Sequence, residues 1–177
     1  MLFRSGEKFS PDAGISLSAP EYPYVSRGGL KLEAALRAFG LKVEGLRAFD
    51  VGQSTGGFTD CLLRHGAAAV LGVDVGTGQL AGALRSDPRV RALEKQDLRT
   101  LDSQVAGPKF PFFVVDVSFV SLRHIVPALP RFLAENSEGV VLVKPQFEVG
   151  PDMVGSGGIV RDAAVCERAV GHVRLVC

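Results

Sequence analysis

The sequence predicts an α/β fold with a mostly parallel sheet and helices on both faces of that sheet. Short apolar segments alternate along the chain with segments whose apolar residues recur at helical spacing. Three of the apolar segments are uninterrupted, as parallel strands buried on both faces are: residues 68–73, 112–115 and 140–143. A glycine-rich turn follows the first strand, where α/β proteins build pockets for nucleotide-like ligands.

The first half of the predicted domain begins near Tyr24, after a segment rich in Ser, Pro and Gly with one short strand-like piece at residues 14–17. Apolar spacing and the stop at Gly40 predict a first helix over residues 30–39. Strands and helices then alternate, with strands at 46–51, 68–75 and, more weakly, 90–93, and helices at 58–65 and 79–85.

The second half continues the alternation with a strand at 112–117, a helix at 120–133 and a fifth strand at 139–143. A long glycine-rich loop covers residues 145–161, and loops of that length are usually functional or disordered. Asp162 is placed to cap a last helix over residues 163–176. The expected division is an N-terminal segment, 1–23, and a main domain, 24–177.

Composition excludes several classes of protein. The 177 residues carry a net charge of +1, so contact with nucleic acid requires a local basic patch. The apolar runs are too short to span a bilayer, and the N-terminus lacks the apolar core of a signal peptide. The three cysteines fit neither a disulfide framework nor metal-ligand spacing, so we expect a cytoplasmic protein without a metal site.

The turn at residues 50–60 is compatible with three chemistries. Gly52 and Gly57 match two glycines of a dinucleotide-binding turn, but Ser54 replaces the glycine that approaches a pyrophosphate. Residues 52–56 also match the G-x-S-x-G nucleophile turn of serine hydrolases. His65 follows too soon to complete a triad in the usual chain order, which counts against that interpretation.

S-adenosylmethionine (SAM) is the third candidate ligand, and acids at successive strand ends favour it. Asp50 ends the first strand and can meet the ligand through the turn or a water. Asp74 ends the second strand, about 20 residues past the turn, where an acid accepts ribose hydroxyls. Asp97 follows the third strand and can accept from an adenine amine. Each acid could instead cap the next helix.

Charged residues at further strand ends are candidates for chemistry. Asp116 and Lys144 each end a strongly apolar strand, and the carboxyl ends of parallel strands line one crevice. Lys31 is a third candidate, although from its position alone a solvated helix face is the more common explanation for such a lysine. Gly28 and Gly29, just before a helix, could bring backbone amides or Arg27 to a phosphate.

Six segments of the chain, taken in order, resemble the TlyA/haemolysin A group of the FtsJ-like (RrmJ-like) rRNA ribose 2′-O-methyltransferases. The resemblance covers about residues 22–165, and its segments are residues 24–32, 50–60, 73–76, 116–122, 143–148 and 157–162. It implies a Rossmann-like class I SAM-dependent methyltransferase fold, SAM as the cofactor, and ribosomal RNA or a ribosomal subunit as the partner.

The resemblance also implies a catalytic Lys-Asp-Lys-Glu tetrad, whose first three members match Lys31, Asp116 and Lys144. Lys144 would remove the proton from a ribose 2′-hydroxyl, Asp116 would orient Lys144, and Lys31 would position the ribose or stabilise the alkoxide. The expected substrate-binding residues are Arg27, Gly28 and Gly29. The expected cofactor-binding residues are Asp50, Gly52, Ser54, Thr55, Gly56, Gly57, Phe58, Asp74, Asp97 and Asp116.

The chain departs from the family pattern in three places. It ends before the family's final Glu and before the last strands of the sheet, and only a remnant of the family's N-terminal S4 RNA-binding domain is expected before residue 24. Gln53 stands where the family more often has Ala. The alternative to an active enzyme is therefore a non-catalytic fragment that binds SAM or RNA. Despite the haemolysin name, we expect no insertion into membranes, since the chain shows no basic amphipathic helix with an aromatic face.

Overall fold

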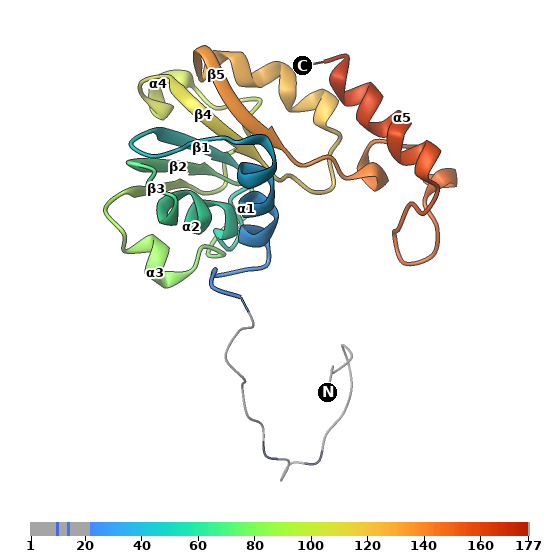
Figure 1. The fold of residues 1–177 in the computed structure, drawn as a ribbon, viewed down its shortest axis with the longest axis horizontal. Helices are drawn as coiled ribbons and strands as arrows, with labels where there is room; N and C mark the ends of the chain where they lie inside the picture. The colour runs from blue at the N-terminus through green and yellow to red at the C-terminus, as the bar shows by residue number, and fades with distance from the viewer. Residues whose placement is uncertain (1–9, 11–13, 15–21, 177) are drawn as a thin grey trace.

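A five-stranded parallel sheet forms the centre of the protein, in the order β3-β2-β1-β4-β5 (Figure 1). The computed structural model describes Ser10, Gly14 and residues 22–176. The strands are β1 (Arg47–Val51), β2 (Ala69–Val73), β3 (Val90–Leu93), β4 (Phe110–Val115) and β5 (Leu133–Val141). The predicted α/β fold is confirmed, whereas the strand-like piece predicted at residues 14–17 lies outside the described residues except for Gly14.

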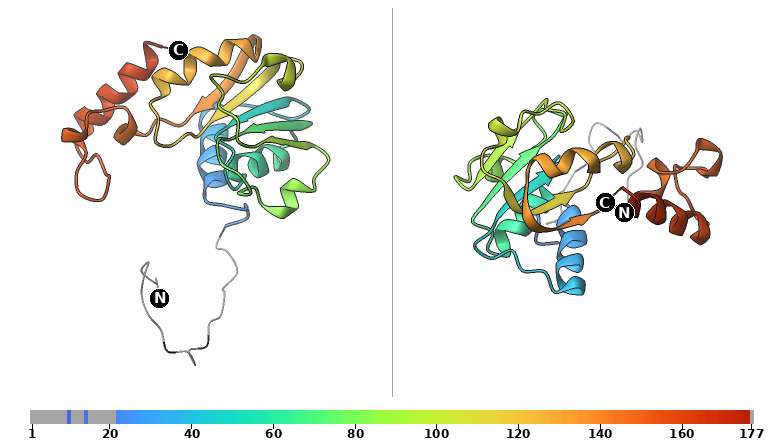
Figure 2. Two further views of the ribbon diagram at one scale, coloured as in Figure 1. Left: turned by 180° about the vertical axis from the view of Figure 1, so that it is seen from behind. Right: turned by 90° about the horizontal axis from the view of Figure 1, so that it is seen from above.

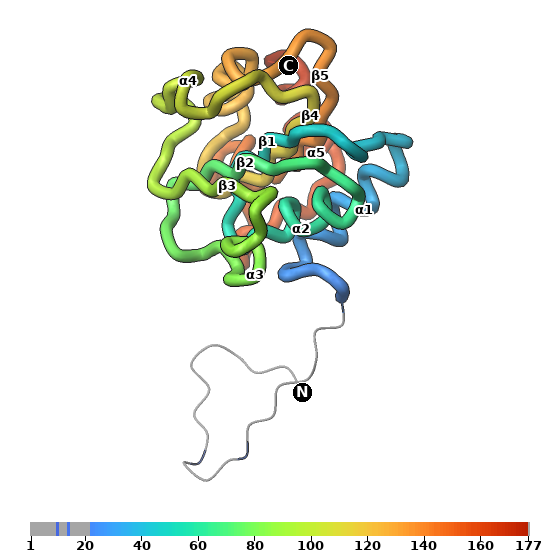
Figure 3. The backbone as a smooth tube through the Cα atoms, turned by 90° about the vertical axis from the view of Figure 1, so that its left-hand side faces the viewer, coloured from blue at the N-terminus to red at the C-terminus, as the bar shows by residue number. Residues whose placement is uncertain are grey.

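Helices cover both faces of this sheet, as Figure 3 shows. The α-helices are α1 (Gly28–Phe39), α2 (Gly57–Arg64), α3 (Gly82–Arg85), α4 (Ser103–Ala106) and α5 (Ala163–Arg174). The 3₁₀ helices are η1 (Leu122–His124), η2 (Val126–Arg131), η3 (Pro145–Phe147) and η4 (Pro151–Met153). The last helix, α5, packs against η1 and η3, away from the centre of the sheet (Figure 2).

Alternation along the strands divides the core into two clusters. In β1, Ala48 faces a cluster that includes α1 and α2 residues, while Phe49 faces a cluster that includes η1 and η2 residues. Val70 and Leu71 of β2 divide in the same way. Side chains of successive strand residues point to opposite faces, so each central strand contributes apolar area to both clusters. This explains the uninterrupted apolar runs in β2 and β4, the two neighbours of β1.

The direction in which the sheet is built reverses between β1 and β4. From β1 the chain proceeds outward to β2 and β3, then returns to place β4 on the other side of β1, followed by β5. The loops after β1 and β4 therefore leave in opposite directions and open a crevice at the carboxyl ends of the strands. The glycine-rich turn and Asp116 both lie at this crevice.

The predicted α-helix over residues 120–133 is wrong. The segment forms the two short 3₁₀ helices η1 and η2 instead. Pro127 and Pro130 supply no backbone N–H, so a continuous α-helical hydrogen-bond pattern cannot run through them. Tighter 3₁₀ turns are common in such short pieces.

Several element boundaries differ from the prediction, and some short elements were not predicted. β5 begins at Leu133 rather than residue 139, with an irregularity in its pairing to β4 between Phe110 and Phe112. The helix predicted from residue 79 begins only at Gly82, because the backbone of Ala81, with φ −56° and ψ 138°, is not helical. The short helix α4 was not predicted, although Asp102 caps it by accepting from the Gln104 amide. The loop after residue 145 contains η3, η4 and a bridge between Gly155 and Ile159.

Replacing Phe49 with alanine should destabilise the fold strongly. The ring is fully buried, stacks on Phe110 with 5.0 Å between centroids, and also contacts Phe132. Truncating such a residue leaves a cavity, so we expect Phe49→Ala to lower the free energy of unfolding by about 3–5 kcal/mol in urea titrations. Phe39→Ala is the matched control, because Phe39 is 70% exposed. Equal losses in the two variants would contradict this account of the core.

Candidate active site

Two adjoining pockets lie at the crevice at the carboxyl ends of the strands. The first, of about 520 Å³, is lined by the ends of β1, β2 and β4, the segment after β3, and the turn after β1. The second, of about 190 Å³, lies between the N-terminal ends of α1 and α2 and the ends of β4 and β5. Both are lined by the same four residues where they meet: Gly52, Ser54, Asp116 and Ser118.

The turn after β1 takes a shape that needs its glycines. Gly52 has φ +86°, and a Cβ built on it would lie 2.5 Å from the Asp116 carbonyl oxygen. Gly56 has φ +96°, and its Cβ would collide with the side chains of Leu80 and Leu84. The absence of a side chain lets the backbone lie close to the end of β4 at Gly52 and close to the leucines of α3 and the preceding segment at Gly56. Ser54 also has a positive φ, of 47°.

Asp74 holds the turn in place and can still accept further hydrogen bonds. One carboxylate oxygen accepts from the Ser54 amide at 2.8 Å, and the other accepts from the Gly76 amide at 2.7 Å. An ionised carboxylate oxygen has two acceptor sites, so each retains one for a ligand hydroxyl. Because Asp74 also lines the larger pocket, its position suits the predicted contact with ribose hydroxyls.

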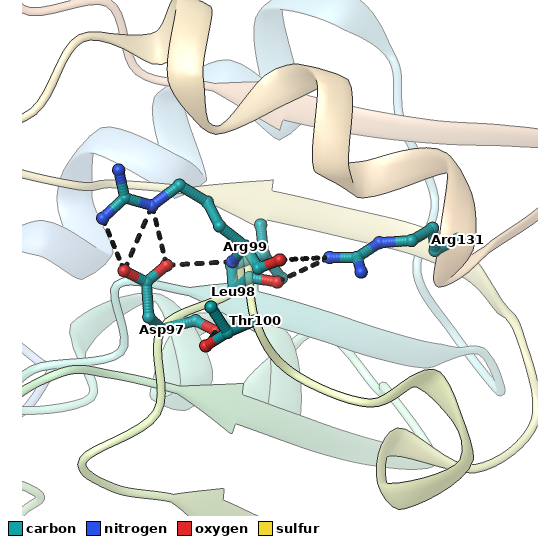
Figure 4. Close-up of polar contacts among 5 residues, drawn as sticks. All are labelled: Asp97, Leu98, Arg99, Thr100 and Arg131. Carbon is teal, nitrogen blue, oxygen red and sulfur yellow. Dashed lines mark hydrogen bonds and ion pairs between the residues drawn. The ribbon is translucent and has the colours of Figure 1, made fainter.

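Asp97 lines the same pocket but is already engaged by Arg99. Its carboxylate accepts from the Arg99 backbone amide at 2.9 Å and from the guanidinium of the same residue, as Figure 4 shows. These hydrogen bonds hold the pKa of Asp97 below its ordinary value. From η2, Arg131 donates to the backbone carbonyls of Leu98 and Arg99. An adenine amine would have to share or displace Arg99 to reach Asp97.

Asp50 lies beneath the turn rather than in either pocket lining. It is fully buried, and one of its oxygens accepts from the Thr59 hydroxyl at 2.6 Å. The Thr59 hydroxyl in turn accepts from the Gln53 amide group at 2.9 Å. The other Asp50 oxygen has no hydrogen-bond partner among the described residues. Burial, together with the negative charge of Asp116, raises the pKa of Asp50 to about 7, against the lowering effect of Thr59.

Gln53 fills with its side chain the space that Gly72 leaves open because a glycine has no side chain. It is buried, and its side chain occupies the position where a Cβ on Gly72 of β2 would lie. Gln53 is thus accommodated by a glycine on the neighbouring strand. Its amide group also links the turn to the Thr59–Asp50 pair.

The three predicted catalytic residues converge on the smaller pocket. Lys31, Asp116 and Lys144 all line it, from α1, the end of β4 and the end of β5. The Lys144 Nζ lies 2.6 Å from an Asp116 carboxylate oxygen, and both side chains are less than a fifth exposed. That oxygen has no partner with hydrogen-bond geometry among the described residues, so the contact is an ion pair rather than an aligned hydrogen bond.

The N-terminal ends of α1 and α2 form the other wall. Gly28 and Phe58 line the smaller pocket, as do Thr55 and Gly57 of the turn, whereas Gly56 and Asp50 line neither pocket. Gly29 packs directly against the Tyr24 ring. Arg27 is exposed at the start of α1 and lies outside both pocket linings. The proposed phosphate contact of Arg27 would therefore be made on the rim.

Two residues near Lys144 were missed in the sequence. Ser118 accepts a hydrogen bond from the Lys144 Nζ at 2.7 Å. Glu148 is buried and accepts from the Ser121 hydroxyl at 2.6 Å and the Leu122 amide at 2.8 Å, which joins the loop after β5 to the loop after β4. An acid four residues after Lys144, in an otherwise apolar segment, was the available signal for Glu148.

Ser54 does not have the surroundings of a nucleophile. Its hydroxyl donates to the Gln79 side chain at 3.1 Å, and no histidine lies in the lining of either pocket. His65 contacts the Cys61 carbonyl instead. Within residues 22–176 we find neither a group of side chains arranged to hold a metal nor a helix long and apolar enough to cross a membrane.

Solved structures with the same architecture define the class of protein. An S-adenosylmethionine-dependent methyltransferase from Mesorhizobium loti matches with a TM-score of 0.54 and 19% identity, covering 79% of this chain and 78% of that chain. A Streptococcus thermophilus protein described as a candidate hemolysin matches with a TM-score of 0.84 and 45% identity, covering 89% of this chain and 57% of that chain. The fold is thus that of SAM-dependent methyltransferases.

The chain belongs to the FtsJ-like methyltransferase family, whose model matches residues 24–175. It is 49% identical over 150 residues to the 16S/23S rRNA (cytidine-2′-O)-methyltransferase TlyA of Mycobacterium tuberculosis, covering 85% of this chain and 56% of the relative. It is 43% identical to Hemolysin A of Brachyspira hyodysenteriae, covering 84% of this chain and 62% of the relative. The chain therefore spans less than two thirds of these relatives. The resemblance stated from the sequence is confirmed.

The buried carboxyl of Asp50 should make stability depend on pH. An unfolded carboxyl ionises near 3.8 and the folded one near 7, so between these values the folded state retains a proton that the unfolded state has lost. Stability should fall as pH rises through this interval and stay low above it. Asp50→Asn cannot ionise, so we expect its melting temperature at pH 8 to exceed that of the unaltered protein by about 2 °C or more.

The gain from Asp50→Asn should shrink toward pH 4, as measured by calorimetric melting across the pH range. Asp152→Asn, at an exposed acid in η4, is the control and should change little at any pH. A gain from Asp50→Asn that is independent of pH would contradict the assignment of this pH dependence to Asp50.

Proposed function

We propose that this protein transfers a methyl group from SAM to a ribose 2′-hydroxyl of ribosomal RNA, in the cytoplasm. The observation that carries the proposal is the convergence of Lys31, Asp116 and Lys144 on a small pocket that adjoins a larger one. The acids Asp74 and Asp97 line the larger pocket. The Mycobacterium tuberculosis relative, named for this reaction on cytidines of 16S and 23S rRNA, supports the proposed substrate class.

The larger pocket suits the cofactor. Asp74 would accept from the ribose hydroxyls with its remaining acceptor sites, and Asp97 would accept from the adenine amine once Arg99 shares or releases it. Gly52 lines both pockets, so its backbone would lie against the bound ligand. When bound, SAM supplies a methyl group attached to a positively charged sulfur, beside the negative charge of Asp116 at the junction of the pockets.

The smaller pocket suits the ribose. The Lys144 Nζ would accept the proton of the 2′-hydroxyl, while Asp116, 2.6 Å away, would hold the amine in position and attract the positive charge that it gains. From the other side of the pocket, Lys31 would stabilise the developing negative charge on the 2′-oxygen. The shared lining residues would bring nucleophile and methyl group together, so positioning supplies much of the rate.

An aromatic pair made of the exposed Phe119, which lines the larger pocket beside the shared residue Ser118, and the partly buried Phe147 suits the base of the target nucleotide. Phe119 is 92% exposed, and its ring lies 5.3 Å from that of Phe147. It follows Ser118 directly and has φ +63°, a conformation that a phenylalanine rarely adopts without a reason. Unstacked RNA bases commonly stack on such aromatic side chains. The pair would hold the base while its ribose enters the smaller pocket.

The assigned roles predict the effect of removing the two paired charges. Lys144→Ala and Asp116→Ala should each lower methyl transfer to ribosomal RNA by about 100-fold or more, because a proton acceptor or its orienting charge is lost. Transfer of radioactive methyl groups from SAM measures the effect. Lys109→Ala, at an exposed lysine just before β4, is the matched control. Near-normal transfer in either Lys144→Ala or Asp116→Ala would overturn the assigned roles.

The choice of cofactor can be measured separately from catalysis. Calorimetric titration should show saturable binding of SAM and none of NAD, and Asp74→Ala should weaken the binding of SAM about tenfold or more, because two ribose hydroxyls lose their acceptor. Binding of NAD without SAM would discard the proposed cofactor. Binding of SAM by the unaltered protein without any transfer to RNA would instead favour the non-catalytic alternative.

A further inference from the structure

We propose that Ser118 is a positioning residue for Lys144: its hydroxyl, together with Asp116, fixes the Lys144 amine so that the lone pair points at the substrate hydroxyl. The inference rests on the proposed function, which makes Lys144 the proton acceptor. Ser118 lines both pockets at their junction, where the methyl group and the 2′-oxygen would meet.

The two contacts of the Lys144 Nζ differ in kind. The nitrogen lies 2.6 Å from Asp116 Oδ1, but that oxygen has no partner with hydrogen-bond geometry among the described residues. The contact with the Ser118 Oγ, at 2.7 Å, is a hydrogen bond with Lys144 as the donor. Asp116 therefore supplies attraction, which depends weakly on direction, and Ser118 supplies the directional contact.

The number of N–H groups on the Lys144 nitrogen determines where its lone pair can point. To accept a proton, the Lys144 ammonium of the ion pair first releases one proton to water, which leaves two N–H groups and one lone pair arranged tetrahedrally around the nitrogen. With one N–H donating to Ser118, the negative charge of Asp116 attracts the second N–H and repels the lone pair, so the lone pair takes the direction away from Asp116. The proton of the 2′-hydroxyl then moves to that lone pair, and Lys144 becomes an ammonium with three donors. The electrons of the broken O–H bond would stay on the ribose oxygen, which would bond to the methyl carbon as the bond between that carbon and the sulfur breaks, with its electron pair left on the now uncharged sulfur.

Losing either contact would leave the amine free to rotate about its Cε–Nζ bond. The lone pair would then face the substrate only part of the time, although Lys144 itself and the charge of Asp116 would still be present. We therefore expect a loss in the rate of transfer rather than in binding. A side chain that only supported the loop would affect folding and both substrates instead.

Steady-state kinetics with Ser118→Ala test the inference. We expect kcat for methyl transfer to fall roughly 10-fold to 100-fold with KM for SAM and for RNA unchanged. Ser118→Thr keeps a hydroxyl on the same carbon and should restore most of the rate. Ser103→Ala, at an exposed serine in α4, is the control for the substitution itself and should leave the rate unchanged.

A second measurement reports on the hydrogen bond without catalysis. Protons of a hydrogen-bonded lysine ammonium exchange slowly with water, so ¹⁵N NMR of the Lys144 Nζ should show faster exchange in Ser118→Ala and slow exchange in Ser118→Thr. Unchanged exchange in Ser118→Ala would overturn the inference, as would unchanged kcat or a loss confined to KM. If the unaltered protein transfers no methyl group to RNA, the proposed function fails and takes the inference with it.

Discussion

The close approach of two backbone segments determines where the site lies. The turn after β1 passes so near the end of β4 that a Cβ on Gly52 would lie 2.5 Å from the Asp116 carbonyl oxygen. Only a glycine leaves room for this contact. β1 and β4 are neighbours at the point where the order of strand addition reverses. The contact between their ends therefore joins the side of the crevice proposed for the cofactor to the side that holds Lys144. The two pockets consequently share a wall.

Contacts between distant loops then fix the catalytic side chains. The loop after β4 and the loop after β5 are joined by the Lys144–Asp116 ion pair, by the Phe119–Phe147 ring contact and by the buried Glu148. Glu148 is the innermost of these links, since its carboxylate accepts hydrogen bonds while almost fully removed from solvent. Positioning of this kind needs a rigid support, because small displacements of a proton acceptor are costly to catalysis.

Much of the fold and of the site follows from local patterns. Uninterrupted apolar runs predicted the strands, and the rule that parallel strands end at one edge brought Asp74, Asp97, Asp116 and Lys144 to one crevice. Local patterns failed where contacts between residues distant in the sequence determine the structure. The pairing of β5 from Leu133 onward depends on β4, and the burial of Asp50 depends on what covers the turn. The hydrogen bond of Ser118 to Lys144 joins residues 26 positions apart, which no local pattern reveals.

The occupation of the space over Gly72 by Gln53 restricts how this turn can evolve. An alanine at position 72 would collide with the Gln53 side chain, whereas an alanine at position 53 would leave that space empty and remove the hydrogen bond to Thr59. The effects of substitutions at the two positions cannot be additive, because the residues share one volume. A side chain added at position 72 would displace the Gln53 amide from its hydrogen bond to Thr59, so it should cost more beside the long amide than beside a short residue. Geometry therefore favours gaining the glycine before the amide and losing the amide before the glycine.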